Sequence, residues 1–432
     1  MKRLFLKNDR AIWVVLALLA AIFFIRFPLK FLQEPPFLMD FSGFHVAAQR
    51  ILRGEAEKLY QPLTTERQVW KYSPTWGILL SPLGLLPLNA GAVVWSTLNV
   101  VWLILTLWLG FRAVSLGGLT SRSFVPLVVV GLLTRPLSAE FLNGQLDLLW
   151  AFLLAAFLFL ELKGRPWGSS LFWAAATSLK LPSGIFLPYW VFRRQWALLG
   201  RAWLCLLLFN GLGALFLNTK EPVLPLIQWA QALKTIGPVE AFDIGSQSLL
   251  AALGRFLTAD PLRLNIANLS RSAVLGAALL LELGLLLAVC RAPGGMEPKQ
   301  RKLLDASMLM VLMLLASPSA WIATFSLLIV PFFAAIGGGL RLGKKFWKNP
   351  VVMAALGVTL AADLLTHKGI WKKLGIVYFR GESYLFLVFM IFTWLGLGLF
   401  LTLWLERSAL ARKGTVLKGL SPSGLETGTD SD

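Results

Sequence analysis

Asp40 has a carboxylate side chain and lies just outside the first expected membrane span. It stands in Met39-Asp40-Phe41-Ser42-Gly43-Phe44-His45, shortly after the first long hydrophobic run. A carboxylate just outside the hydrocarbon can act as a general base, taking a proton from an attacking hydroxyl group. Asp is also a good N-cap, and a helix is expected to begin near Phe41, so a structural role for Asp40 is open as well.

His45 and Tyr60 follow in the same segment and are assigned to the same predicted pocket. His45 lies five residues after Asp40. That spacing is about 1.4 helical turns, so the two side chains do not squarely share a face. His45 is therefore interpreted as a hydrogen-bonding helix residue rather than as a second acid–base group.

Lys180 is the cation best placed to meet an anion. Its junction, Lys180-Leu181-Pro182-Ser183-Gly184, joins two expected spans, 167–179 and 182–192. At ~1.5 Å per residue the first is only about 20 Å long, against ~30 Å of hydrocarbon, so Lys180 is expected below the outer surface. No carboxylate lies in its own hairpin, and an unpaired buried ammonium group is costly. A ligand phosphate is one expected partner; the alternative is a side chain that extends to the interface.

Further polar residues are expected on the same outer side. Gln145 and Asp147 either cap the next helix or line a pocket. The other predicted pocket residues are Asp243, Gln247 and Trp321.

The composition predicts an all-α polytopic membrane protein. Of 432 residues, 57% are hydrophobic and 18 are Trp, and the mean hydropathy is +0.70; no soluble core needs so much apolar sequence. The net charge is +19, but the basic residues lie in short loops, as the positive-inside rule predicts, and nucleic acid is not an expected partner. Cys205 and Cys290 lie in apolar runs and have no disulfide or zinc spacing.

The basic clusters define the inner side and give about twelve spans with both termini inside. They are the N-terminus, Arg112 to Arg122, Lys163 to Arg165, Arg193-Arg194, Arg291 to Lys302, Arg341 to Lys348 and the tail from Arg407. Residues 1–405 form the expected transmembrane domain, with long external segments at about 28–71 and 218–266. Residues 72–88 carry three prolines and are expected to be a broken or re-entrant element. Residues 406–432 are polar and are predicted to be a disordered cytoplasmic tail.

No sequence motif indicates a cofactor. The chain has no P-loop, no GxGxxG after a strand, no HExxH and no DxD pair in the first external segment. A bound divalent metal is therefore not expected, and a lipid-borne sugar donor fits better than a soluble nucleotide sugar.

Several short motifs, in order, resemble glycosyltransferase family 87 of the GT-C superfamily. They are Asp40-Phe41 through Gly54, Leu59 to Pro62, Tyr72-Ser73-Pro74, Asn143-Gly144-Gln145-Leu146-Asp147, Ser178-Leu179-Lys180-Leu181-Pro182, Gly245 to Leu249 and Ser317-Pro318-Ser319-Ala320-Trp321. The resemblance implies a GT-C-type fold with amphipathic helices in a long first external loop. It also implies inverting transfer of a sugar, typically mannose, from a polyprenyl-phosphate carrier to a lipid or glycan acceptor, with Asp40 as base and no metal.

Two positions depart from the family pattern. Ile322-Ala323-Thr324 follow Trp321, where the family often has an acidic residue and His, and Asp147 stands where Asn is more usual. The preferred interpretation is a hexosyltransferase of the bacterial inner membrane whose site faces the exterior. In it, Lys180 holds the donor phosphate and membrane lipids surround the spans. A lipid-linked sugar flippase and a catalytically lapsed scaffold protein are the alternatives.

Overall fold

The computed structural model describes residues 2–33, 38–62, 69–218, 221, 223–241, 245–259, 266–291, 293–344, 348–366 and 390–419. Within these ranges the chain is helical and contains no strand. The protein is therefore an all-α membrane protein, as the composition predicts.

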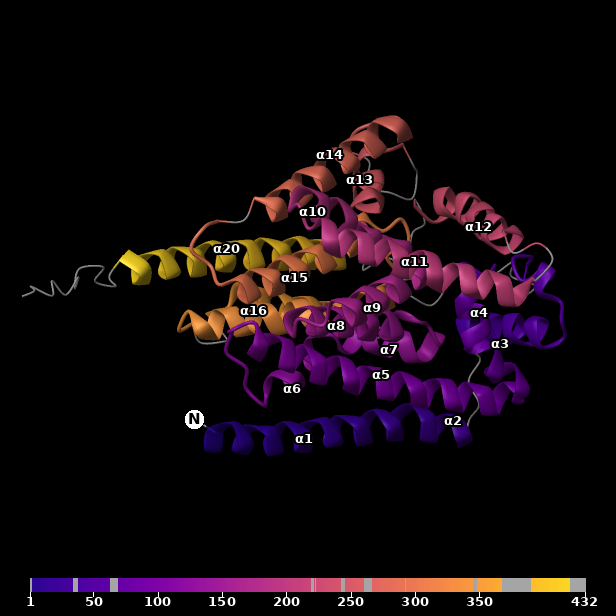
Figure 1. Ribbon diagram of the computed structural model, residues 1–432, viewed down its shortest axis with the longest axis horizontal. Coiled ribbons are helices and arrows are strands. Elements are labelled where there is room, and N and C mark those ends of the chain that lie inside the picture. The colour runs from indigo at the N-terminus through magenta and orange to yellow at the C-terminus, as the bar shows by residue number, and fades with distance from the viewer. Residues whose placement is uncertain are drawn as a thin grey trace, which may run out of the picture.

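The helices lie side by side along the long axis of the molecule (Figure 1). Those before the middle of the chain are α1 (Lys2–Phe24), α2 (Lys30–Gln33), α3 (Met39–Leu52), α4 (Pro74–Leu80), α5 (Leu88–Leu116), α6 (Val125–Leu132), α7 (Thr134–Asn143), α8 (Asp147–Leu162), α9 (Pro166–Leu179) and α10 (Phe186–Phe192). Those after it are α11 (Trp196–Leu217), α12 (Leu224–Ala241), α13 (Leu249–Leu257), α14 (Arg271–Cys290), α15 (Pro298–Ala316), α16 (Ile329–Arg341), α17 (Pro350–Thr366) and α20 (Ile391–Gly419). Short 3₁₀ helices join several of them: η2 (Ala56–Lys58), η3 (Ser81–Leu85), η4 (Leu181–Ile185) and η5 (Ile322–Leu328).

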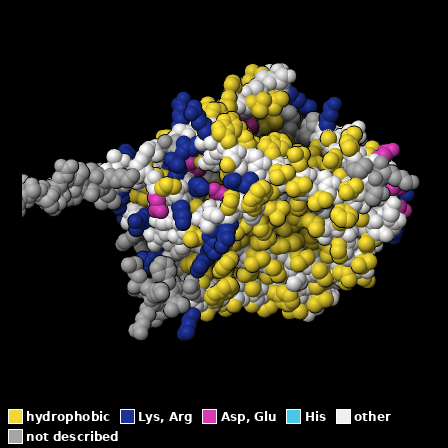
Figure 2. All heavy atoms as spheres, viewed as in Figure 1, with side chains coloured by type: hydrophobic (Ala, Val, Ile, Leu, Met, Phe, Trp, Pro, Cys, Tyr) yellow, Lys and Arg dark blue, Asp and Glu magenta, His cyan; other side chains and the backbone are white. Residues whose placement is uncertain are grey.

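The two ends of the molecule differ in what they carry. The N-terminus of α1 and the C-terminal end of α20 lie at one end, and α3, α4 and α12 lie at the other (Figure 1). In Figure 2 the Lys and Arg side chains gather toward the first end, and hydrophobic side chains cover much of the face beyond them. This arrangement agrees with basic clusters on the inner side and external segments on the opposite side.

Five described helices are long and apolar enough to cross a membrane, or six if the bent pair α6 and α7 counts as one span. The other helices on which the count of about twelve rests are shorter or more polar; α8 has 16 residues and α9 has 14. The total of about twelve stays a prediction.

Three predicted boundaries need correction. The first span does not end at residue 27: it continues to Gln33, because a π-helical turn, Ile25–Leu29, accommodates Pro28. The sequence predicts an external turn from Arg135 to Gln145, but most of this stretch belongs to α7, which is bent by 67° from α6. The predicted disordered tail begins too early: α20 runs to Gly419, because Arg407 is fully buried and bonded to neighbouring helices. Residues 420–432 lie outside the described part of the chain.

The proline-rich segment 72–88 is broken, as expected. Pro74 occupies the first turn of α4, where a missing N–H costs nothing, and Ser81 ends this helix and begins η3. α4 packs against α3 and α11, so it belongs to the outer end of the molecule that positions the site.

Candidate functional site

Asp40 lies in the first turn of α3. The N-cap of this helix is Leu38, and no side chain caps it, so the N-cap interpretation of Asp40 is wrong. The helix dipole still favours a carboxylate at this position. Asp40 is half-buried, which leaves it accessible to a reacting group.

The junction between α7 and α8 brings Gln145 to Asp40. Gly144 ends α7 with φ of 68°, a left-handed conformation that suits glycine, and a Cβ there would lie 2.8 Å from the Cβ of Phe41. This close approach of Gly144 to α3 lets the Gln145 side chain hydrogen-bond to Asp40. The Trp95 indole holds the same turn by donating to the Gly144 carbonyl at 3.0 Å.

Lys180 is not the unpaired cation that the sequence suggested. It forms an ion pair with Asp147, which begins α8, and its ammonium group lies 5.4 Å from the centre of the Trp150 ring. The Asp147 side chain is fully buried, whereas that of Lys180 is 22% exposed. Sequence reasoning missed this pair because Asp147 is 33 residues away and reaches Lys180 only through the packing of α8 against α9.

Glu140 is a second acidic group that sequence reasoning missed. It is fully buried, and its Oε1 accepts a hydrogen bond from the Leu148 backbone at 3.1 Å. Its Oε2 has no partner among the described residues, and the charges of Asp147, Lys180 and Asp40 all act on it. The sequence signal that could have identified it is an acidic residue seven positions before Asp147, between the two hydrophobic runs 124–133 and 148–160.

These five residues form one cluster, which we call the Asp40–Lys180 cluster: Asp40, Glu140, Gln145, Asp147 and Lys180. Burial is the main influence on Asp40 and raises its pKa above the ordinary carboxyl value. The hydrogen bond from Gln145 and the charges of Lys71 and Lys180 act in the opposite direction, and the charge of Asp147 adds to the increase. A carboxylate with a raised pKa is a stronger base than an exposed one.

The sequence profile of Glycosyltransferase family 87 matches residues 70–318, more than half of the chain. The chain belongs to glycosyltransferase family 87. The match includes Gln145, Asp147, Lys180 and Gln247, so the family assignment covers most of the cluster, while Asp40 lies before its first residue. No curated protein matches the sequence.

The segment around Trp321, just after the family match, contacts the cluster. Thr324 follows Trp321 in η5 and donates to the Asp147 carboxylate at 3.5 Å. The Trp321 ring packs directly on Gly245, leaving no room for a Cβ there. Thr324 thus connects the segment after Trp321 to Asp147.

Gln247 is buried beside this segment. Its backbone N–H donates to the Ala320 carbonyl at 2.7 Å, and its carbonyl accepts from Thr393 at 2.7 Å. Both polar atoms of its side chain are buried without a partner among the described residues. Buried amides normally have partners, so Gln247 is suited to meeting a ligand.

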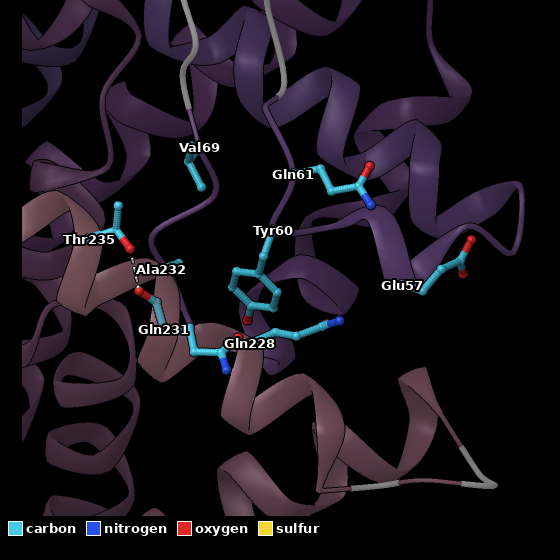
Figure 3. Close-up of a pocket in the computed structure, with 8 residues that line it drawn as sticks. All are labelled: Glu57, Tyr60, Gln61, Val69, Gln228, Gln231, Ala232 and Thr235. Carbon is cyan, nitrogen blue, oxygen red and sulfur yellow. Dashed lines mark hydrogen bonds between the residues drawn. The ribbon is translucent and has the colours of Figure 1, made fainter.

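The remaining predicted site residues lie elsewhere. His45 is buried, and its Nε2 lies 2.8 Å from the Leu86 carbonyl, so it fastens α3 to the end of η3, which supports the hydrogen-bonding interpretation. Tyr60 donates to the Tyr72 carbonyl at 3.1 Å and lines a separate cavity, together with residues of α12 (Figure 3). Asp243 lies outside the described residues. Within the described ranges, no three His, Cys, Asp or Glu side chains gather as a metal site requires.

Proposed function

We propose that this glycosyltransferase moves a hexose, such as mannose, from a polyprenyl-phosphate carrier to a lipid or glycan acceptor with inversion at the anomeric carbon. The site faces the exterior of the bacterial inner membrane, and no metal takes part. Family membership supports the transferase and disfavours the flippase; the carrier, the sugar and the orientation are part of the proposal.

The observation that carries the proposal is the half-buried Asp40 carboxylate beside two cations. Its raised pKa favours proton uptake, and the Gln145 hydrogen bond holds one orientation. Lys71 and Lys180 both act on Asp40, so positive charge lies close to the proposed base. This is the charge distribution needed where a hydroxyl loses a proton and a phosphate leaves.

In the proposed reaction, a carboxylate oxygen of Asp40 accepts the proton of an acceptor hydroxyl group. The acceptor oxygen forms a bond to the anomeric carbon from the face opposite the phosphate. The bond between that carbon and the phosphate oxygen breaks, and its electron pair leaves with the polyprenyl phosphate. One displacement of this kind inverts the configuration and leaves the proton on Asp40.

Lys180 is proposed to stabilise the charge that develops on the departing phosphate. An ammonium group has three donors, and the ion pair with Asp147 does not require all of them. The pair and the Trp150 ring hold the ammonium group in place, while the exposed part of Lys180 can face a ligand. Because the ammonium group is already held in place, it can stabilise the negative charge of the transition state without first having to move.

The experiment compares Asp40→Asn with the wild-type enzyme. Purified protein receives a labelled polyprenyl-phosphate mannose and a bacterial lipid extract, and the product glycolipid and its anomeric configuration are determined. We expect an inverted product from the wild type. Asp40→Asn should lower the transfer rate by about 10²–10⁴-fold, because an amide cannot take the proton.

Glu55→Gln is the matched control. Glu55 lies in the same external segment, forms an exposed ion pair with Lys58 and is remote from the reaction in the proposal. It should transfer sugar at the wild-type rate. Undiminished transfer by Asp40→Asn, or a product with retained configuration, would rule out the proposed base. Flux of the labelled lipid across vesicles without a new glycosidic bond would favour the flippase.

A further inference from the structure

A cavity lies between the first external segment and α12, and most of the residues that line it have polar side chains. Its volume is about 330 Å³, at the lower end of the range of small-molecule sites. Tyr60 lies in the middle of the opening, Gln61 and Glu57 come from the first external segment, and Gln228 and Gln231 come from α12 (Figure 3). We call this space the α12 cavity.

The lining of the α12 cavity is chemically distinctive. Three of the described lining side chains are carboxamides, from Gln61, Gln228 and Gln231, and Glu57 is the acidic residue among them. None of the described lining residues is Lys or Arg, although the whole chain has a net charge of +19. Each carboxamide offers both donors and an acceptor, which matches vicinal hydroxyl groups, whereas a phosphate group would need cations.

The segment 69–72 runs from the α12 cavity, which Val69 lines, toward α3, which carries Asp40. The Lys71 side chain acts electrostatically on Asp40, while its backbone carbonyl accepts a hydrogen bond from the Trp229 indole of α12 at 2.9 Å. The next carbonyl, of Tyr72, accepts from Tyr60 in the cavity. The Tyr72 ring packs on Phe44, one turn after Asp40 on α3, with ring centres 5.6 Å apart. One short segment therefore connects the cavity to the proposed base.

We infer that the α12 cavity binds an uncharged sugar unit of the acceptor, next to the unit whose hydroxyl group Asp40 deprotonates. This inference rests on the proposed function and deepens it, because it assigns the acceptor to the neutral glycans and glycolipids with at least two sugar units. No Lys or Arg is among the described residues that line the α12 cavity, so the donor phosphate is assigned to the Lys180 side in this inference.

Binding is tested without catalysis, on the full-length protein in lipid nanodiscs. Saturation-transfer NMR measures the binding of three neutral trisaccharides, of mannose, glucose and galactose, and of one anionic trisaccharide that contains glucuronic acid. We expect at least one neutral trisaccharide to bind and the anionic one to bind more weakly. The double variant Gln228→Ala/Gln231→Ala should weaken the neutral sugar by about tenfold, because two amide contacts are lost.

Two further variants keep the result interpretable. Lys234→Ala changes an exposed residue of α12 that does not line the cavity, and should bind sugar like the wild type. Asp40→Asn is measured for sugar transfer alone, because Asp40 contacts the acceptor hydroxyl group in the proposed reaction. No binding by any neutral trisaccharide, or equal binding by the double variant, would overturn the subsite. Undiminished transfer by Asp40→Asn would overturn the proposed function instead, so the two failures are distinguishable.

Discussion

Two buried acid–base clusters of this protein differ in how completely they are satisfied. In the inner one, which we call the Asp305–Arg407 cluster, Arg407 of α20 donates to Asp305 of α15 at 2.7 Å, and Tyr189 donates to the second Asp305 oxygen at 2.8 Å. Arg407 also donates to the carbonyls of Ala288 and Val289 at the end of α14. Neither side chain of the ion pair is more than 1% exposed.

The Asp40–Lys180 cluster has the opposite character. Lys180 is partly exposed, one oxygen of Glu140 has no partner in the described chain, and neither polar atom of the neighbouring Gln247 side chain has one. Among the described residues, the Asp305–Arg407 cluster leaves one buried polar atom, Arg407 Nε, without a partner, and its other bonds fix helices relative to one another. The Asp40–Lys180 cluster and Gln247 leave more such atoms, which a ligand can satisfy. From this difference we expect the Asp305–Arg407 cluster to contribute stability and the Asp40–Lys180 cluster to contribute chemistry.

The largest effect on stability is expected from Arg407→Met. The variant leaves the Asp305 carboxylate buried without its cation, which costs about 3–5 kcal/mol. The thermal unfolding midpoint in detergent should fall clearly below that of the wild type. Arg412→Met, at an exposed position of the same helix, is the control and should unfold with the wild type. Equal midpoints for Arg407→Met and the wild type would remove the structural role of the inner cluster.

Lys180→Met should lower kcat by about 10²–10³-fold, the usual cost of losing one group that stabilises transition-state charge. Lys302→Met is the matched control: Lys302 also forms an ion pair, with Glu161 at 2.5 Å, but is 39% exposed, and such pairs contribute about 0–1 kcal/mol to stability. Lys180→Arg keeps the charge and should restore part of the rate. Similar kcat values for Lys180→Met and Lys302→Met would make Lys180 a structural residue only.

A smaller effect, on the pH profile, is expected from Gln145→Ala. Activity requires deprotonated Asp40, so the rate rises with pH through the pKa of Asp40, which burial raises. The Gln145 hydrogen bond lowers this pKa, so its loss should move the acidic limb to higher pH and leave the alkaline plateau in place. Lys71→Gln should shift the limb in the same direction. If the acidic limb of the pH–rate profile of Gln145→Ala stayed in place or moved to lower pH, Asp40 would not control the rate.

Much of the outer cluster could be predicted from local sequence. Asp40, Gln145, Asp147 and Lys180 each stand next to a Gly or Pro motif or a helix end, and the positive-inside rule assigned them to one side. The structure brings these four together. Short motifs and basic loops indicate the topology of the chain, and this topology determines on which side of the membrane these four residues lie.

The partners within the clusters could not be predicted, because they depend on how distant helices pack. Asp147 pairs with Lys180 only because α8 lies on α9. Arg407 was assigned to a polar tail, since its partner Asp305 is 102 residues away and no local pattern connects them. Glu140 was taken as part of an exposed turn, and its burial follows from the sharp bend between α6 and α7.

One measurement tests the account most directly: the single-turnover rate of sugar transfer by Asp40→Asn and by Arg407→Met, each divided by its folded fraction. We predict a loss of at least about 10²-fold for Asp40→Asn, the lower bound for general-base catalysis, and a near wild-type rate for the folded part of Arg407→Met. A near wild-type rate for Asp40→Asn, or an equal loss in both variants, would contradict the division between a catalytic outer cluster and a structural inner one.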